Sequence, residues 1–400
     1  MIQHHFMNNI LKKYLNLKFQ NIKWGEIKVN FKNSYEKIFK ANQGDLASNI
    51  VIKDNTFFSD VFLKGELGFA ESYISNKWET SNLTNLLKIL LKNQQIKKKN
   101  WANNYLSLFI EKFKFFLKSN SINQAKKNIY YHYDLGNNFY SLWLDKSMTY
   151  SSGIFNNEND DLFTSQTNKY DNIIKNLKIE TSDNVLEVGS GWGGFIKRNS
   201  HTVKSNIDAL TISEQQYDYV RNLISDNKLN NNSKVFLKDY RKLDLINTYD
   251  KIVSIEMFEA VGRKYWDQYF KILNRALKIN GKACCQIITI DDKEYENYIN
   301  QVDFIQKYIF PGGVLPSKKI LYKLFKDNNF ELYQEKSFGD DYAKTLKLWK
   351  DGFNKSWSQI SELKFDTKFK NLWNYYLSYC ETGFATGHTN VSQFFLKKVM

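Results

Sequence analysis

The chain has 400 residues, 42% hydrophobic and 16% aromatic, which is enough to bury the cores of two to three domains. Its three cysteines, two of them adjacent, exclude a disulfide framework, and the Cys/His spacings of a zinc site are missing, so we expect a reducing, cytoplasmic setting and no metal. No apolar run approaches the roughly 20 residues that cross a bilayer, and the N-terminus lacks the apolar core and cleavage site of a signal peptide.

The net charge of +15 is concentrated near the N-terminus. Residues 1–128 hold 21 Lys, no Arg and 9 Asp or Glu, which gives +12 and leaves +3 for the rest of the chain. A basic module beside a near-neutral body favours an anionic partner, either lipid headgroups or nucleic acid. A general bias toward Lys, Asn and Ile would produce the same charge, so composition alone leaves that alternative open.

An amphipathic helix is predicted at residues 101–120. Its apolar residues recur at spacings of three and four: Leu106, Phe109, Ile110, Phe113, Phe116 and Leu117. Such a helix can lie on a membrane surface, or it can pack its apolar stripe against the next domain. The polar stretch at 119–128 predicts a boundary between a smaller basic domain at 1–125 and a second domain at 126–400.

Short β-rich runs alternate with helical segments from residue 180 onward. The predicted strands are Asn184–Val188, Ile207–Thr211, Lys234–Lys238, Lys251–Ile255 and Ala283–Ile288. This alternation predicts an α/β fold with a doubly wound, Rossmann-like parallel sheet covered on both faces. The only two prolines, Pro311 and Pro316, frame Gly312 and Gly313 in one fixed turn, which predicts a lid-like insertion at about 289–345.

A glycine-rich turn follows the first of these strands. Glycines at 189, 191 and 193 let the backbone pass close to a ligand where a Cβ would clash. The spacing differs from the G-x-G-x-x-G that cradles a dinucleotide pyrophosphate. The acidic Glu187 just before the first glycine suits a ligand with an amino group, such as the methionine part of S-adenosylmethionine (SAM).

The next two strand ends carry matching polar residues. Thr211, Ser213, Glu214 and Gln216 follow the second strand, where a doubly wound sheet has its ligand crevice. Asp239-Tyr240-Arg241 follows the third strand and offers an acceptor and an aromatic face for adenine. The three strand ends together predict a SAM site.

Several further motifs add to the three strand-end motifs and point to one known family. They are Tyr131–Asn137, Met148–Gly153, Met257–Gly262, Tyr308–Pro316, Tyr342–Leu346 and Tyr379–Phe384, together with the three strand-end motifs. In this order they resemble the cyclopropane-fatty-acyl-phospholipid synthase family, which includes the mycolic acid cyclopropane synthases. The resemblance covers about residues 130–400, and a weaker match at Gly65–Tyr73 extends it into the basic domain.

The resemblance implies methyl transfer from SAM to a cis double bond in a phospholipid acyl chain, followed by loss of a proton and closure of a cyclopropane ring. The residues expected near SAM are Tyr150, Ser151, Glu187, Gly189, Ser190, Gly191, Trp192, Gly193, Thr211, Ser213, Gln216, Asp239, Tyr240 and Arg241. Aromatic faces would stabilise the cation, and the candidates are Tyr133, Tyr140, Trp143, Tyr150, Phe155 and Phe258. The implied proton acceptor is a bound bicarbonate.

The resemblance also implies the residues that hold this bicarbonate and line the reaction site. They are Glu259, Tyr342, Ser152, Gln286, His132 and Cys380. Ser152 stands where the family has cysteine, and Gln286 stands at or near the family's histidine. Both replacements can still form hydrogen bonds. If the anion site is lost, another proton loss would give a methyl-branched chain.

The expected setting is the inner face of a membrane, with the basic domain bound peripherally to phospholipid and a homodimer as one possible assembly. A nucleic-acid methyltransferase is disfavoured because residues 1–128 contain no Arg, the usual reader of phosphates and bases. A lipid-binding protein with a degenerate cofactor site is disfavoured by the intact glycine turn. A small-molecule methyltransferase stays as a further alternative.

Overall fold

The computed structural model describes residues 19–31, 35–97 and 135–399. The predicted helix at 101–120, the predicted boundary at 119–128, and His132 and Tyr133 lie outside these residues. The chain forms two compact units, residues 1–112 with 364–386 (unit 1) and residues 113–363 with 387–400 (unit 2). Unit 1 is therefore built from two segments that are distant in the sequence.

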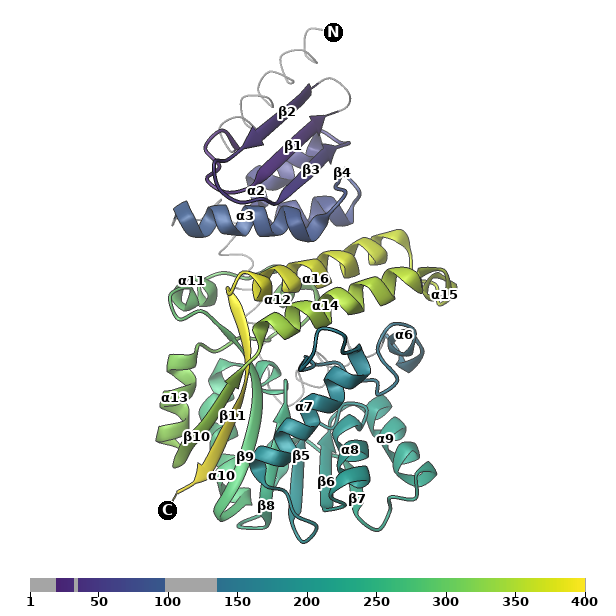
Figure 1. Ribbon diagram of the computed structural model, residues 1–400, viewed down its shortest axis with the longest axis vertical. Coiled ribbons are helices and arrows are strands. Elements are labelled where there is room, and N and C mark those ends of the chain that lie inside the picture. The colour runs from purple at the N-terminus through teal and green to yellow at the C-terminus, as the bar shows by residue number, and fades with distance from the viewer. Residues whose placement is uncertain (1–18, 32–34, 98–134, 400) are drawn as a thin grey trace. The chain divides into compact units, whose positions relative to one another are not determined.

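Unit 1 contains a four-stranded sheet in the order β2-β1-β3-β4 (Figure 1). Its strands are β1 (Glu26–Phe31), β2 (Tyr35–Lys40), β3 (Ala47–Ile52) and β4 (Trp78–Glu79), and its helices are α2 (Thr56–Ile74), α3 (Leu83–Lys97) and α16 (Thr367–Ala385). Alternate residues Ile27, Val29 and Phe31 of β1 are buried, so one face of the strand supplies the core. Helix α16 packs against α3 and α2, and Thr84 Oγ1 donates a hydrogen bond of 2.9 Å to Glu381 Oε2.

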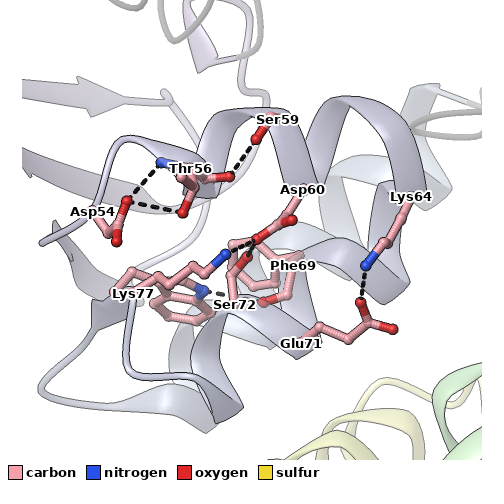
Figure 2. Close-up of polar contacts among 10 residues, drawn as sticks. Asp54, Thr56, Ser59, Asp60, Lys64, Phe69, Glu71, Ser72 and Lys77 are labelled. Atoms are coloured by element: carbon pink, nitrogen blue, oxygen red, sulfur yellow. Dashed lines mark hydrogen bonds and ion pairs between the residues drawn. The ribbon is translucent and has the colours of Figure 1, made fainter.

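Helix α2 is sharply kinked at Gly65, which divides it into two helical arms. Gly65 adopts a left-handed φ of 58° that favours glycine. Figure 2 shows the two arms joined by an ion pair between Lys64 and Glu71, with Nζ and Oε2 2.6 Å apart. On the inner side, Asp60 accepts a hydrogen bond of 3.1 Å from Ser72. A Cβ at Gly68 would collide with the backbone carbonyl of Asp60, so the close approach of the arms requires glycine there.

Unit 2 is organised around a seven-stranded sheet in the order β10-β11-β9-β8-β5-β6-β7 (Figure 1). The strands are β5 (Asn184–Val188), β6 (Asn206–Thr211), β7 (Ser233–Leu237), β8 (Tyr249–Ile255), β9 (Leu277–Ile290), β10 (Phe330–Ser337) and β11 (Thr389–Lys398). Strands β5 to β9 pair in parallel, whereas β11 is antiparallel to both β9 and β10. All five predicted strands are confirmed, and β10 and β11 extend the sheet beyond them.

Helices cover both faces of this sheet, as the doubly wound prediction requires. One core joins α7 (Leu162–Leu177), α8 (Gly194–Thr202) and α9 (Glu214–Asp226) to the sheet, and the other joins α10 (Trp266–Ala276) and α13 (Lys318–Asp327) to it. Adjacent residues of β9 point to opposite faces of the sheet. Cys284 belongs to the core under α7, α8 and α9, and Cys285 belongs to the core under α10 and α13.

The remaining elements of unit 2 are short, apart from one long helix. They are α6 (Asn137–Ser141), α11 (Tyr295–Ile299), α12 (Phe304–Tyr308), α14 (Gly339–Lys355), α15 (Trp357–Glu362) and the 3₁₀ turns η1 (Tyr240–Lys242), η2 (Phe258–Ala260) and η3 (Arg263–Tyr265). The chain leaves β5 toward β6 and β7, then returns to form β8 on the other side of β5. Ligands of such sheets bind at this reversal point, beyond the carboxyl ends of β5 and β8. Among the residues that the structure describes, no helix is long and apolar enough to cross a membrane.

Candidate active site

The glycine turn after β5 is open toward the reversal point. Gly189, Gly191 and Gly193 have φ values of 93°, 50° and 80°, all in the left-handed region that favours glycine. A Cβ at Gly191 would meet no atom within 4 Å, whereas a Cβ at Gly189 would lie 3.0 Å from Met257 Cγ. The turn thus presents bare backbone on one side and packs against the residues that follow β8 on the other.

Glu187 lies in β5 beneath this turn and is buried. Its Oε2 accepts no hydrogen bond from any residue that the structure describes. Burial raises the pKa of Glu187 well above its usual range, and the positive charge of Lys169 opposes that rise. A buried acceptor without a partner costs free energy, so a bound ammonium group would satisfy it. Glu187 and the open turn therefore fit the amino-acid end of SAM.

The turn is joined to its neighbours by hydrogen bonds. The N–H groups of Gly189 and Ser190 both donate to Leu210 O at the end of β6, at 3.0 and 2.8 Å. Trp192 Nε1 donates to Asn137 Oδ1 at 2.8 Å, and its ring centroid lies 4.9 Å from that of Tyr140. Helix α6 is thereby tied to the predicted SAM turn.

The polar residues after β6 largely satisfy one another. Thr211 Oγ1 donates to Gln216 Oε1 at 2.9 Å, and Ser213 Oγ accepts from Gln216 N at 3.3 Å as the N-cap of α9. All three side chains are buried. The structure thus brings these predicted residues together at the strand end, with helix capping as one of their roles.

After β7, Asp239 is paired with Arg241. Arg241 Nη2 lies 2.6 Å from Asp239 Oδ2 and its Nε donates to Oδ1 at 3.0 Å, while Asp239 also caps η1 through Arg241 N. Both side chains are almost fully buried. The Tyr240 ring packs at right angles to Tyr269, 5.3 Å between centroids. Arg241 therefore engages both oxygens that were expected to face adenine.

A second polar cluster, here called the carboxylate cluster, surrounds Glu256 at the end of β8. Its Oε1 accepts from Ser152 N at 2.9 Å and from Gln286 Nε2 at 2.7 Å, and its Oε2 accepts from Tyr342 Oη at 2.6 Å. Three predicted residues, Ser152, Gln286 and Tyr342, thus converge on one carboxylate that sequence reasoning missed. Burial raises the pKa of Glu256, and the Tyr342 hydrogen bond and the charge of Lys169 oppose the rise.

Ser152 contributes its main chain to this cluster. Its hydroxyl donates to Gly153 O at 2.9 Å, so only its N–H reaches Glu256. The next residue, Gly153, lies against Ser165 of α7, where a Cβ would collide with the serine side chain. This contact with α7 positions the segment.

Glu259 follows one turn later, in η2. Its Oε1 accepts from Ile288 N at 2.5 Å, and its Oε2 has no hydrogen-bond partner among the described residues. Burial and the neighbouring charge of Glu256 raise the pKa of Glu259 to about 8, so this group is a neutral carboxylic acid at pH 7. Val314 N, in the predicted Pro-Gly-Gly turn, donates to Glu259 O at 3.1 Å, which ties that turn to the site.

Lys169 of α7 is a second residue that sequence reasoning missed. Its fully buried Nζ donates to Ser151 Oγ and to Gln166 Oε1, both at 2.6 Å. Burial lowers the pKa of Lys169 to about 7, although the charges of Glu256, Asp145 and Glu187 oppose the fall. Lys169 therefore provides positive potential to both buried carboxylates, Glu187 and Glu256.

An aromatic wall lies beside the carboxylate cluster. Each of its rings has its centroid within about 6 Å of at least one other, and they belong to Tyr140, Trp143, Tyr150, Tyr342 and Trp349. Of the other aromatic candidates, Phe258 packs on Trp266, Tyr269 and Phe270 in the core under α10. Phe155 packs against Lys344.

The model of the mycolic acid cyclopropane synthetase family matches residues 120–394 of the chain. The chain belongs to this family. The tuberculostearic acid methyltransferase of Mycobacterium tuberculosis is 31% identical over 343 residues, which cover 83% of this chain and 79% of that protein. The cyclopropane-fatty-acyl-phospholipid synthase of Escherichia coli is 32% identical over 360 residues, 86% of each chain.

Solved structures agree with this membership. A mycolic acid cyclopropane synthase complexed with SAH and CTAB has a TM-score of 0.64 and 29% identity, covering 68% of this chain and 98% of that one. Another synthase of the family, from Mycobacterium tuberculosis, has the same TM-score at 26% identity. The predicted family and α/β methyltransferase fold are thereby confirmed, and the protein is a SAM-dependent methyltransferase.

The structure leaves two predicted catalytic residues, His132 and Cys380, without an assigned role. His132 lies outside the described residues. Cys380 is half-buried on α16, which belongs to unit 1. The other two thiols, Cys284 and Cys285, are buried in β9, where burial raises their pKa values.

Proposed function

We propose that this enzyme transfers the methyl carbon of SAM to the cis double bond of an unsaturated acyl chain in a membrane phospholipid and closes a cyclopropane ring. The observation that carries the proposal is a buried carboxylate cluster and an aromatic wall at the strand end next to the SAM turn. The named activity of the Escherichia coli relative, cyclopropane-fatty-acyl-phospholipid synthase, points to the same substrate class.

Bound SAM supplies an electrophilic methyl group, which the π electrons of the acyl double bond attack. The residues of the chain then have two tasks. The faces of Tyr150, Trp143 and neighbouring rings stabilise positive charge on the acyl chain by cation–π attraction without offering a nucleophile. A base removes one proton, and the position of the proton that is lost decides the product.

A methyl-branched chain is the second candidate product, because the tuberculostearic acid methyltransferase is about as similar to this chain as the synthase is. If the lost proton comes from the newly added carbon, the released electron pair can close the ring. If it comes from a neighbouring carbon of the acyl chain, a double bond remains beside a methyl branch. Both outcomes add one carbon and two hydrogens to the chain.

The experiment uses vesicles of dioleoyl phosphatidylglycerol and dioleoyl phosphatidylethanolamine with ¹³C-methyl-labelled SAM. The released fatty acids are analysed by mass spectrometry before and after mild palladium-catalysed hydrogenation, which reduces a double bond and leaves a ring intact. A labelled product that resists hydrogenation supports the synthase, and one that takes up hydrogen supports the branched product. If no label enters the acyl chains, both candidates fail.

Membrane contact through unit 1 is part of the proposal. Phe62 and Leu63 lie next to the kink of α2 at Gly65, with 66% and 52% of their surfaces exposed. Large apolar side chains at a helix corner, in the Lys-rich part of the chain, suit insertion between anionic headgroups. Peripheral binding at the inner face of a membrane agrees with this exposure. The homodimer stays a prediction, which analytical ultracentrifugation would test.

A further inference from the structure

Three donors that the family resemblance assigns to a bound bicarbonate, from Ser152, Gln286 and Tyr342, bond the carboxylate of Glu256 instead. We propose that Glu256 is itself the proton acceptor of this enzyme, and that no bicarbonate takes part. This inference rests on the proposed acyl-chain chemistry. Its first support is that three donors from three separate segments, the main chain of Ser152, the amide of Gln286 in β9 and the hydroxyl of Tyr342 in α14, all end on this one carboxylate.

Three of the groups that were expected to hold a bicarbonate are already engaged at Glu256: Ser152 N, Gln286 Nε2 and Tyr342 Oη all donate to its carboxylate. The Ser152 hydroxyl donates to Gly153 O, and the Oε1 of Gln286 accepts from Gln393 Nε2 at 3.0 Å. A bicarbonate within reach of these donors would have to lie beside the Glu256 carboxylate, where desolvation and like-charge repulsion both oppose it. Among the residues that the structure describes, this donor set fits a carboxylate that belongs to the chain and does not fit a bicarbonate.

Glu256 is also next to the predicted SAM turn. It directly follows β8, the neighbour of β5 in the sheet, and the next residue, Met257, packs on Gly189. Glu256 has a φ of 48°, and its N–H donates to Gln286 O at 2.8 Å. A left-handed backbone is uncommon for a residue with a side chain, and such conformations concentrate at functional sites.

The two neighbouring carboxyl groups differ in charge. Glu259 accepts from Ile288 N, and its Oε2 has no partner among the described residues. Both oxygens of Glu256 accept from strong donors, and Lys169 contributes positive potential. Hydrogen bonds to a carboxylate favour its ionised form. Glu256 is therefore the ionised member of the pair and Glu259 the protonated one, which is the division expected when one carboxylate serves as base.

The proposed step balances without another reactant. The acyl double bond forms a bond to the methyl carbon, the carbon–sulfur bond breaks, and S-adenosylhomocysteine leaves with that electron pair. Glu256 then takes a proton from the new carbon, and the electrons of the broken C–H bond close the ring. The carboxylic acid so formed loses its proton to water when the product leaves. A branched product differs only in which carbon loses the proton.

The first test is Glu256→Gln, which keeps the size of the side chain and an oxygen for Ser152 and Gln286. We expect kcat to fall 10²- to 10⁴-fold, the usual contribution of a general base, with the SAM affinity within about threefold of wild type. Glu331→Gln, on the exposed side of β10, is the matched control and should keep full activity. Wild-type turnover in the Glu256→Gln variant would overturn the proposal.

The second test measures bicarbonate directly. ¹³C-labelled bicarbonate is titrated into wild type and Glu256→Gly with S-adenosylhomocysteine present, and binding is followed by NMR. We expect no binding to the wild type and binding to the variant, whose freed donors can hold the anion. Saturable binding to the wild type at the same donors, lost in Gln286→Leu, would overturn the proposal. This readout needs no acyl substrate, so it stays informative even if the proposed function fails.

The third test measures enzyme activity with and without bicarbonate. Wild type assayed in carbonate-free buffer should keep its rate, whereas Glu256→Gly should be inactive there and regain at least tenfold activity with added bicarbonate or formate. A wild type that loses activity on carbonate removal and recovers on its return would show that the anion, and not Glu256, takes the proton.

Discussion

Gln393 Nε2 donates a hydrogen bond of 3.0 Å to Gln286 Oε1 across the antiparallel pair of β11 and β9. Gln393 Oε1 in turn accepts from Asn172 Nδ2 of α7 at 2.5 Å. This chain of amides determines which end of Gln286 faces Glu256, since an amide that accepts on its oxygen side must point its NH₂ the other way. Gln393 is thus a positioning residue for the carboxylate cluster, although it does not touch Glu256.

Gln393→Leu should therefore weaken the hydrogen bond from Gln286 to Glu256. A carboxylate that loses a donor has a higher pKa, so the acid limb of the kcat–pH profile should move to higher pH. One net hydrogen bond contributes about 1 kcal/mol, which corresponds to a fall in kcat of roughly fivefold near neutral pH. Gln334→Leu, at an exposed position of β10, is the control. An unshifted acid limb at reduced kcat would mean that Gln393 has only a structural role.

Glu259→Gln should change how stability depends on pH. The pKa of Glu259 rises from 4.5 to about 8 in the fold, so between these values the native state keeps a proton that the unfolded state has lost. Stability contributed by this group is full below pH 4.5 and is lost as the pH rises toward 8. Each pKa unit corresponds to about 1.4 kcal/mol, so wild type should lose up to about 4 kcal/mol relative to the variant between pH 5 and 8. Urea denaturation at both pH values measures the difference, and parallel curves would contradict the assignment.

Lys169→Met should change the pH dependence of stability in the opposite direction to Glu259→Gln. The pKa of Lys169 falls from 10.5 to about 7 in the fold, so between these values the unfolded state binds a proton that the native state lacks. Wild-type stability should therefore rise with pH across this window relative to the variant, by up to about 3 kcal/mol between pH 7 and 9.5. Chemical denaturation of both proteins at the two pH values measures the change. A constant difference would show that the buried amine keeps its ordinary pKa.

The parallel strands were predictable because each is a short apolar run between helical segments and ends at a polar motif. Strands β10 and β11 were not, because β11 pairs antiparallel with β9, more than a hundred residues earlier. The membership of α16 in unit 1 depends on contacts between residues still farther apart in the sequence, such as that between Thr84 and Glu381. Such pairings leave no local periodicity to detect.

The candidate site also contains residues that the sequence predicts and residues that it does not. Ser152, Gln286 and Tyr342 could be singled out from motifs, and the structure brings them together. The sequence does not distinguish Glu256 from Glu259, three residues later, because the φ of 48° and the three converging donors appear only in the structure. Lys169 gives no signal in the sequence, because a lysine in an amphipathic helix ordinarily faces water. A charged residue directly after a buried parallel strand is the one sequence signal that could have identified Glu256.

The Phe62→Ser/Leu63→Ser double variant tests membrane contact by unit 1. Burial of one large apolar side chain contributes about 1.5–3 kcal/mol, so loss of both should weaken binding to dioleoyl phosphatidylglycerol vesicles by about tenfold or more, even with shallow insertion. Ile246→Ser is the matched control, because Ile246 is 67% exposed and lies in unit 2. Vesicle co-sedimentation at low and high salt separates the apolar contribution from that of the lysines, since screening weakens only the latter. Activity on detergent-dispersed substrate should be unchanged, because the carboxylate cluster lies in unit 2. Equal vesicle binding by the double variant and wild type would place the membrane contact elsewhere on the chain.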